Sequence, residues 1–425
     1  MRKALSGSEA VTFRLGMQMR HETWRNFQID FGGSVLFALF NVVVNQFYAP
    51  MAIRHGATNL DVGLLSAAPA IGMLLSPLWA GLMGQRSPKP FVLWPLTIGR
   101  MSVMIAGVFL SPFVFVFISF VVNFMNGIQA PAYPSLLTRV YPPHLRGRLM
   151  GYVRVAQGFL LIPLAYIVGI WSQATGDRWP LILAALFGTA SVILFCRVRE
   201  VEPRPEIAQG APDASRRSLL TSARRQWSLV RENRALALFL AATTATGFGN
   251  LLAGPIYQIY QVHTLNLSND QIGMTRVAYY VALLVAYFAL GWLIDKWSPR
   301  VAMFVGMLAY TLAPLLYVLF GSYFGVIVSC MFLGVGDAAW DIGCMAYIFK
   351  VTPGREATAF GLHYLLFGIR GTIAPILSTA LTHSMSLSEV FLASAAISAI
   401  GVGLFCLPQR PPTLPSGASS ISQVS

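Results

Sequence analysis

Long apolar stretches separated by short polar segments run through most of this chain. Twelve of them are long enough to cross a bilayer as helices, since a span needs about 20 mainly apolar residues. They lie at about residues 29–53, 60–84, 91–110, 112–138, 149–172, 179–197, 235–262, 271–293, 301–320, 322–349, 358–383 and 387–407. The pattern predicts an all-α membrane protein with twelve transmembrane helices. A long polar segment precedes the first stretch, so we expect a span there rather than a cleaved signal peptide.

Short motifs of the first half return in the second half 210 positions later. Residues 81–90 correspond to 291–300, each between two apolar stretches, and the loop 143–151 corresponds to 353–361. Weak parallel repeats in a very apolar chain are typical of secondary transporters, in which two halves rock around a central site. The chain is therefore predicted to hold two six-helix pseudo-repeats.

The polar segments set the expected domain boundaries. Residues 1–28 form an N-terminal segment, 29–197 the first six-helix domain and 235–408 the second. The segment 198–234, rich in Pro and then in Arg, is expected to be a linker with a stretch on the membrane surface. Residues 409–425 are rich in Pro and Ser and are predicted to be a disordered tail.

Composition and charge support a membrane location. Hydrophobic residues make up 56% of the chain, charged residues 11%, and the mean hydropathy is +0.62. The net charge of +14 is concentrated in alternate loops, while the intervening loops hold only Arg54 and Arg178. By the positive-inside rule, both termini and the linker are expected in the cytoplasm, and the protein in a bacterial-type inner membrane. The basic charge then needs no nucleic-acid partner to explain it.

Several chemistries find no support in the sequence. The four cysteines, Cys196, Cys330, Cys344 and Cys406, form no Cys-x-x-Cys pair and predict neither a disulfide framework nor a bound metal. No lysine follows a glycine, as a nucleotide-binding loop requires. No set of nucleophile, base and oxyanion donors is visible. We expect a protein without enzymatic activity or cofactor, acting as a monomer, with transport driven by a gradient or a partner subunit.

The repeated loops resemble those of the major facilitator superfamily over about residues 28–408. The family's loop between helices 2 and 3 reads roughly Gly-x-Leu-x-Asp-Arg-x-Gly-Arg-Arg. The first copy has Gly81, Met83, Gln85, Arg86, Pro88 and Lys89, and the second has Gly291, Leu293, Asp295, Lys296 and Arg300. The loop after helix 4, with Arg146, is also similar to the family pattern. The resemblance implies alternating access and a cytoplasmic latch between the halves, with gating roles for Arg86, Asp295, Lys296, Arg300 and Arg146.

Two family features are missing from the sequence. Many members carry an Arg four residues before a Gly in helix 4, a feature linked to proton coupling, and here Asn123 precedes Gly127. The Gly-Pro signature of many drug/proton antiporters is absent from helix 5. The coupling ion, the direction of transport and the substrate are therefore not indicated by the resemblance.

Polar residues recur at helical spacing in three helices that line the cavity in the family. They are Asn41, Asn45 and Tyr48 in helix 1; Asn123, Asn126 and Tyr133 in helix 4; and Asn250, Tyr257 and Gln261 in helix 7. Steps of three or four place each set on one face. Hydrogen bonding between packed helices would also explain them, but three stripes on the three expected helices favour a wet cavity.

The ionisable groups of the spans are not mirrored between the repeats. Asp337 and Asp341 lie four apart in helix 10, and Arg370 in helix 11 shares a face with His363. Asp337 and Arg370 are expected at a similar depth, where they would pair, and Asp341 is expected to face Arg154 of helix 5 across the two halves. Such charges mark either a substrate or coupling site or a structural ion pair.

The remaining span charges have simpler expected roles. Arg100 is predicted to be structural, Arg276 to snorkel to the outer surface, and Asp30 to cap the first helix. Four span arginines against three acids favour an anionic solute. Asp337 and Asp341 with His363 would equally suit a cation or a metal ion such as iron. A non-transporting membrane scaffold is the alternative from another class.

Overall fold

A computed structural model describes residues 11–83, 86–201, 228–353 and 355–408. Its first half holds β1 (Val11–Arg14), β2 (Met17–Arg20), α1 (His21–Val42), η1 (Val43–Phe47), α2 (Tyr48–Arg54), α3 (Asn59–Leu74), α4 (Ser76–Met83), α5 (Pro88–Phe109), α6 (Pro112–Val140), α7 (Pro143–Thr175) and α8 (Arg178–Phe195). The second holds α10 (Arg234–Ile259), η2 (Tyr260–Thr264), α11 (Asn269–Lys296), α12 (Pro299–Phe320), α13 (Tyr323–Ala338), η3 (Ala339–Gly343), α14 (Cys344–Val351), α15 (Glu356–Leu381) and α16 (Leu387–Cys406).

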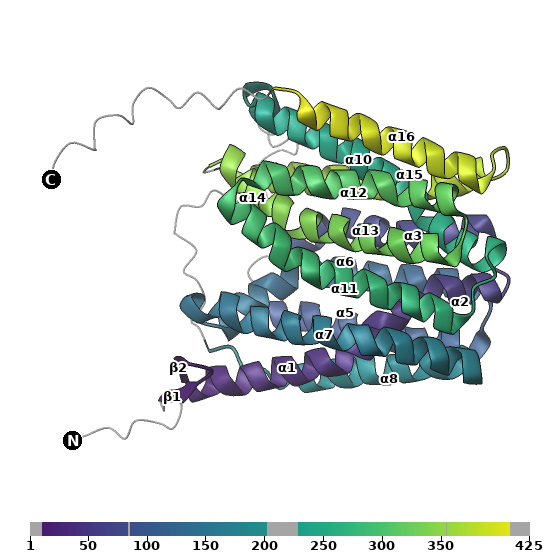
Figure 1. Cartoon of the computed structure of the whole chain (residues 1–425). Helices are drawn as coiled ribbons and strands as arrows, with labels where there is room; N and C mark the ends of the chain where they lie inside the picture. Colours follow the sequence, from purple (N-terminus) through teal and green to yellow (C-terminus); the bar gives the residue numbers. More distant parts are fainter. Residues whose placement is uncertain (1–10, 84–85, 202–227, 354, 409–425) are drawn as a thin grey trace, which may run out of the picture.

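The helices form two bundles, which we call the N half (α1–α8) and the C half (α10–α16), packed side by side (Figure 1). The β1–β2 hairpin and the end of α16 lie on one side of the molecule, the terminal face. The opposite side, with the connections α2–α3, α7–α8, η2–α11 and α15–α16, is the distal face. The all-α architecture of two six-helix repeats predicted from the apolar pattern is confirmed.

Eleven helices of the described chain are long and apolar enough to cross a membrane. The expected second span, 60–84, is divided at Leu75 into α3 and α4. Pro77 has no N–H to continue the α-helical bonding, and the amide of Leu78 donates to the Leu75 carbonyl instead, 3.1 Å away. The second crossing therefore consists of α3 and α4 together.

Three π-helical turns interrupt spans 1, 7 and 10, at η1, η2 and η3. Such turns change which side chains face a given direction and are frequent at functional sites. They place Asn45, Gln261 and Asp341 off the regular helical register. An apolar pattern does not predict these turns, so none was expected from the sequence.

The first helix differs from its prediction. It begins at His21 rather than near residue 29, so Asp30 lies inside α1. Asp30 is buried and accepts a hydrogen bond from the Tyr141 hydroxyl at 2.8 Å. The predicted capping role is therefore wrong. Residues 1–10, most of the linker (202–227), the tail (409–425) and Gln85 lie outside the described residues.

The two halves meet mainly at two helix pairs, α3 with α15 and α7 with α11. Glycines allow this approach on the distal side. A Cβ at Gly63 would lie 2.3 Å from Thr379 Oγ1, and a Cβ at Gly169 would lie 2.6 Å from the Asn269 carbonyl oxygen. We call these contacts, with the polar bonds around Asn269, the distal seam.

Candidate functional site

A cavity of about 570 Å³ lies between the halves and is lined mainly by the N half. We call it the N-half cavity. Five of its polar side chains belong to the predicted stripes, among them Asn45, Asn123, Asn126 and Tyr133. Asn45 donates to Asn41 Oδ1 at 3.0 Å, so these two residues share a face as the spacing predicted. Tyr48 also lines the cavity and donates to the Phe115 carbonyl at 3.0 Å.

The N-half cavity contains three charged side chains, Asp30, Arg100 and Arg154. Arg100 donates to the Gly188 carbonyl at 3.0 Å and to Ser191 at 2.7 Å, which fits its predicted structural role. Arg154 is exposed, and the described chain offers it no hydrogen-bond or ion-pair partner. Arg154 is therefore the cation of this cavity that is available to bind a solute.

A second cavity of about 350 Å³, the C-half cavity, adjoins the first at Leu251. It contains Asp337, Asp341 and Arg370 together with Asn250, and its wall includes Tyr279, Tyr310, Trp340 and Phe367. The sequence predicts candidate roles for Asp337, Asp341, Arg370 and Asn250. The aromatic wall was not predicted, because apolar composition does not distinguish a ring that faces a cavity from one that faces lipid.

Tyrosines, rather than arginines, hold the two carboxylates. Asp337 accepts hydrogen bonds from the hydroxyls of Tyr279, at 2.5 Å, and Tyr310. Asp341 accepts one from Tyr287 at 2.5 Å. A carboxylate that accepts hydrogen bonds from hydroxyl donors needs no adjacent cation. The tyrosines lie on α11 and α12, so no spacing within helix 10 could have revealed them.

The predicted ion pair between Asp337 and Arg370 is not formed, although both line the C-half cavity. Arg370 donates to the Thr243 carbonyl at 2.5 Å, and its guanidinium carbon lies 5.4 Å from the centre of the Trp340 ring. A Cβ at Gly247 would lie 2.6 Å from that carbon, so α10 supplies a flat surface for the guanidinium. Nε of Arg370 is buried without a partner.

His363 and Arg370 both contact Trp340, as their shared helical face predicted. His363 is buried and stacks on Phe239, with ring centroids 6.0 Å apart. It lines neither cavity. No group of three or more His, Cys, Asp or Glu in the described residues converges as metal ligands. Asp337, Asp341 and His363 therefore do not form a common site for a metal cargo in this conformation.

Two members of the predicted helix 7 stripe lie in the protein core. Tyr257 packs between Tyr317 and Phe391, and Gln261 donates to Tyr317 at 2.6 Å. Neither residue lines the N-half cavity or the C-half cavity. Arg276, expected to snorkel, is instead buried and donates to Gln258 at 2.9 Å and to Gln261. The turn at η2 and a buried arginine thus direct Gln261 inward.

Within the described residues, those assigned to a latch make no hydrogen bond or ion pair between the halves. Arg86 and Asp295 are exposed, and no ion pair joins them in the described chain. Lys296 lies over Trp292, Arg300 donates to the Phe405 carbonyl at 3.0 Å, and Arg146 donates to the Thr138 carbonyl at 3.0 Å. These partners all belong to the same half as the cation, so the terminal face is unlatched in this conformation.

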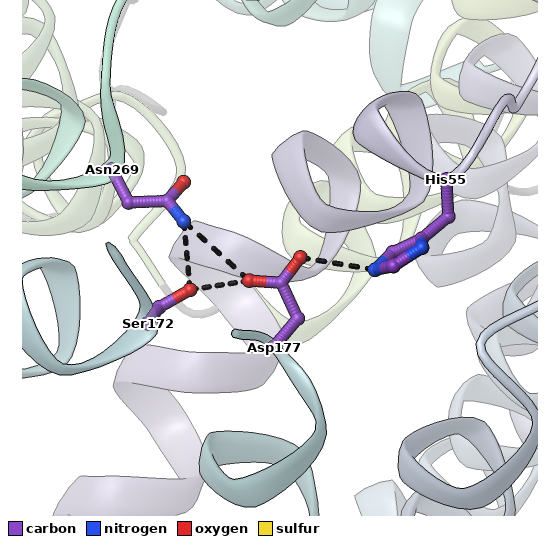
Figure 2. A network of polar contacts seen from close by, with 4 residues as sticks. All are labelled: His55, Ser172, Asp177 and Asn269. Carbon is purple, nitrogen blue, oxygen red and sulfur yellow. Dashed lines mark hydrogen bonds and ion pairs between the residues drawn. The ribbon is translucent and has the colours of Figure 1, made fainter. Parts of the chain in front are cut away.

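The distal face, in contrast, is closed by polar contacts between the halves (Figure 2). Asn269 of the C half donates to Ser172 at 2.8 Å and to Asp177 Oδ1 at 3.5 Å, and Ser172 also donates to Asp177. His55 Nε2 lies 3.2 Å from Asp177 Oδ2. Sequence reasoning missed this network, because its members come from three separate connections.

Further bonds cross the distal seam. Arg54 donates to the Leu267 carbonyl, and Asn59 donates to Thr382 at 2.9 Å. Together with the glycine contacts, they close both cavities toward the distal face. Since the terminal side lacks such bonds in the described residues, the site is arranged to admit a solute from one side only.

Comparison with known proteins identifies related sequences. Residues 31–259 and 239–423 match the family model described as Major Facilitator Superfamily. The chromaffin granule amine transporter of Rattus norvegicus is 24% identical over 380 residues, which cover 86% of this chain and 69% of that protein. The quinolone resistance protein NorA of Staphylococcus aureus is 24% identical over 356 residues, covering 82% of this chain and 86% of NorA.

Solved structures share the fold. The nucleoside transporter NupG superposes with a TM-score of 0.67 at 13% identity, covering 91% of this chain and 98% of NupG. A bacterial homologue of the human lysosomal transporter Spinster, in an inward-facing and unoccupied conformation, gives a TM-score of 0.65 at 13% identity. The match to the Spinster homologue covers 91% of this chain and 96% of that protein.

Proposed function

Because this chain belongs to the major facilitator superfamily, we propose that it is a secondary active transporter that moves a small organic solute by alternating access. The observation that carries this proposal is the asymmetry of the seam between the halves. Polar and glycine contacts join them on the distal face, and the charged loops of the terminal face bind within their own halves. A carrier that can reverse this asymmetry exposes its site to each side in turn.

The terminal face is proposed to be cytoplasmic, in a bacterial-type inner membrane. Lys and Arg are concentrated in its loops, while Arg54 and Arg178 are the basic residues that the sequence places in distal loops. The conformation is then inward-facing. A phosphatase reporter fused in the linker near residue 214 tests the orientation, since activity of the periplasmic reporter there would contradict it.

The cavity charges support two candidate solute classes. Asp337 and Asp341 beside Trp340 and two tyrosines would suit a protonated amine, because carboxylates and aromatic faces both attract cations. One similar protein is named an amine transporter. Arg154, without a partner, would suit an anionic group. Arg100, Arg276 and Arg370 are all bound to neutral groups, which weakens the argument for an anion from the number of span arginines alone.

Alternating access can be tested before the solute is known. Spin labels at Leu60 and Ser384 report on the distal face, and labels at His144 and Lys350 on the terminal face, all in a cysteine-free background. In lipid nanodiscs we expect two distance populations per pair. Conditions that lengthen the distal distance should shorten the terminal one. A single unchanging distance on both faces, across solutes, pH and ion gradients, would support the scaffold alternative.

A further inference from the structure

The strongest unexplained feature is Arg154 in the N-half cavity. It is exposed to the cavity without a partner, whereas Arg100 and Arg370 are each bound to backbone oxygens of their own half. Its charge interacts electrostatically with Asp30 and Tyr133 of the N half and with Tyr287 of the C half. Among the cations of the site, Arg154 is thus the one whose charge acts on groups of both halves.

Its counterpart across the seam is Asp341. This carboxylate is exposed, accepts a hydrogen bond from Tyr287, and has no cation within 4.0 Å in the described chain. Asp337 lies one turn away on the same helix and is likewise bound only by tyrosines. The C-half cavity therefore contains two carboxylates that no arginine neutralises directly.

The α7–α11 contact fixes where these groups face each other. A Cβ at Gly158 of α7 would lie 3.1 Å from Leu284 of α11, so the helices still touch there. The two helices run in opposite directions through the bundle. Arg154, four residues before Gly158, and Tyr287, three residues after Leu284, both lie about one turn closer to the terminal face. Arg154 thus lies at a similar level to Tyr287, which binds Asp341, on the two facing helices.

The two cavities have opposite charge excesses. With ionised carboxylates, the N-half cavity has two arginines against Asp30, and the C-half cavity has two aspartates against Arg370. Unbalanced charge is costly within a membrane protein unless a partner neutralises it. The cavities adjoin at Leu251, so one bound molecule can reach both.

We propose that the transported solute is dipolar, a small organic molecule with an ammonium group at one end and a carboxylate at the other. The ammonium binds at Asp341 and Asp337 beside Trp340, and the carboxylate binds Arg154. This assignment rests on the proposed transport function and unites its two candidate solute classes. A dipolar solute neutralises both cavities at once and draws α7 toward α11, so its binding favours closure of the terminal face.

The test uses a matched chemical series on the purified full-length protein. ω-Aminocarboxylates with one to five methylene groups are compared with the alkylamine and the alkyl carboxylate of the same length, and with an equimolar mixture of the two. The readout is the thermal unfolding midpoint in detergent. We expect at least one dipolar compound to raise it by roughly 2 °C or more at saturation, and the mixture to have less than half that effect.

Variants assign each end of the solute. Arg154→Gln should reduce the shift from the dipolar compound to that of the amine, and Asp341→Asn should reduce it to that of the carboxylate. Arg148→Gln is the matched control, because Arg148 is an exposed arginine of α7 that lines neither cavity. It should leave the dipolar shift unchanged.

The failures of the two proposals are distinguishable. Equal stabilisation by the amine alone or the carboxylate alone would overturn the dipolar assignment and leave transport intact. Failure of the whole dipolar series, or an unchanged shift in Arg154→Gln, would also overturn it. A dipolar shift with spin-label distances fixed on both faces would instead contradict transport while the binding assignment stands.

Discussion

The polar groups on the two faces of this protein find their partners in opposite ways. On the distal face, Asn269 and Asn59 donate hydrogen bonds across the two halves. On the terminal face, Arg146 and Arg300 bind carbonyls of their own half. The distal bonds hold the halves together, whereas the terminal bonds only order each half. The comparison indicates that the conformation depends on whether polar groups find partners in the opposite half or in their own half.

The largest effect is expected from fixing the distal seam covalently. A Cβ at Gly63 would lie 3.2 Å from the Thr379 Cβ, close to the roughly 3.5–4.5 Å of a disulfide. In a cysteine-free background, oxidised Gly63→Cys with Thr379→Cys should lose at least ~100-fold of solute uptake, because one state is excluded. Uptake into proteoliposomes of the solute that stabilises the protein measures this.

Reductant should restore that uptake, and each single cysteine variant is the control for its own substitution. Full uptake by the cross-linked protein would show that the distal seam does not open during transport.

Placing a bulkier side chain in the distal seam should have the next largest effect. A Cβ at Gly169 would meet the Asn269 carbonyl at 2.6 Å, and a backbone atom cannot rotate away. Gly169→Val should therefore destabilise the closed seam by ~1–3 kcal/mol and lengthen the Leu60–Ser384 spin-label distance. Gly147→Val is the control, since Gly147 lies on the same helix with open space around it. An unchanged distal distance in Gly169→Val would contradict the role of close packing.

Removing a polar bond of the seam should act more weakly. Asn269→Ala loses the donor to Ser172 and Asp177, worth ~1–2 kcal/mol together after exchange with water. We expect the distal-open population to rise about fivefold to thirtyfold. Asn59→Ala, which removes the single bond to Thr382, should shift it less. If the Asn59 variant had the larger effect, the network of Figure 2 would not be the main polar closure.

The smallest effect is expected on the terminal face. Asp295 is exposed and without an ion-pair partner in the described part of the chain, so Asp295→Asn should leave the present conformation unchanged. If Asp295 forms the latch when that face closes, the substitution should disfavour the closed state by ~0–1 kcal/mol. Cysteine labelling at the terminal mouth should rise, and Asp295→Glu should not change it. Equal labelling in both variants would count against the latch.

Much of the candidate site was within reach of the sequence. Asn45, Asn123, Asn126 and Tyr133 line a cavity because helical spacing puts polar residues on one face. Spacing does not say where that face points once a helix is distorted. The π-helical turn η2 and the buried Arg276 direct Gln261 into the core. Of the predicted helix 7 stripe, Asn250 lines the C-half cavity, whereas Tyr257 and Gln261 lie in the core.

The charged residues show the same limit. The absence of repeat symmetry drew attention to Asp337, Asp341 and Arg370, and the structure places all three in one cavity. Equal depth did not predict their partners, because depth along one helix leaves open which neighbour supplies a donor. Tyr279 and Tyr310 donate hydrogen bonds to Asp337 from two other helices. The Arg370 guanidinium donates to the Thr243 carbonyl.

The sequence by itself determined the membrane class, the two-fold repeat of six spans and the residues costly enough in lipid to mark a site. These follow from local quantities, namely the length of apolar stretches, the spacing of motifs and the position of charge. Only the tertiary structure decided which groups meet and which face is closed. Those outcomes depend on contacts between helices far apart in the chain, such as Asn269 with Ser172, and a rocking protein exchanges such contacts without any change in its sequence.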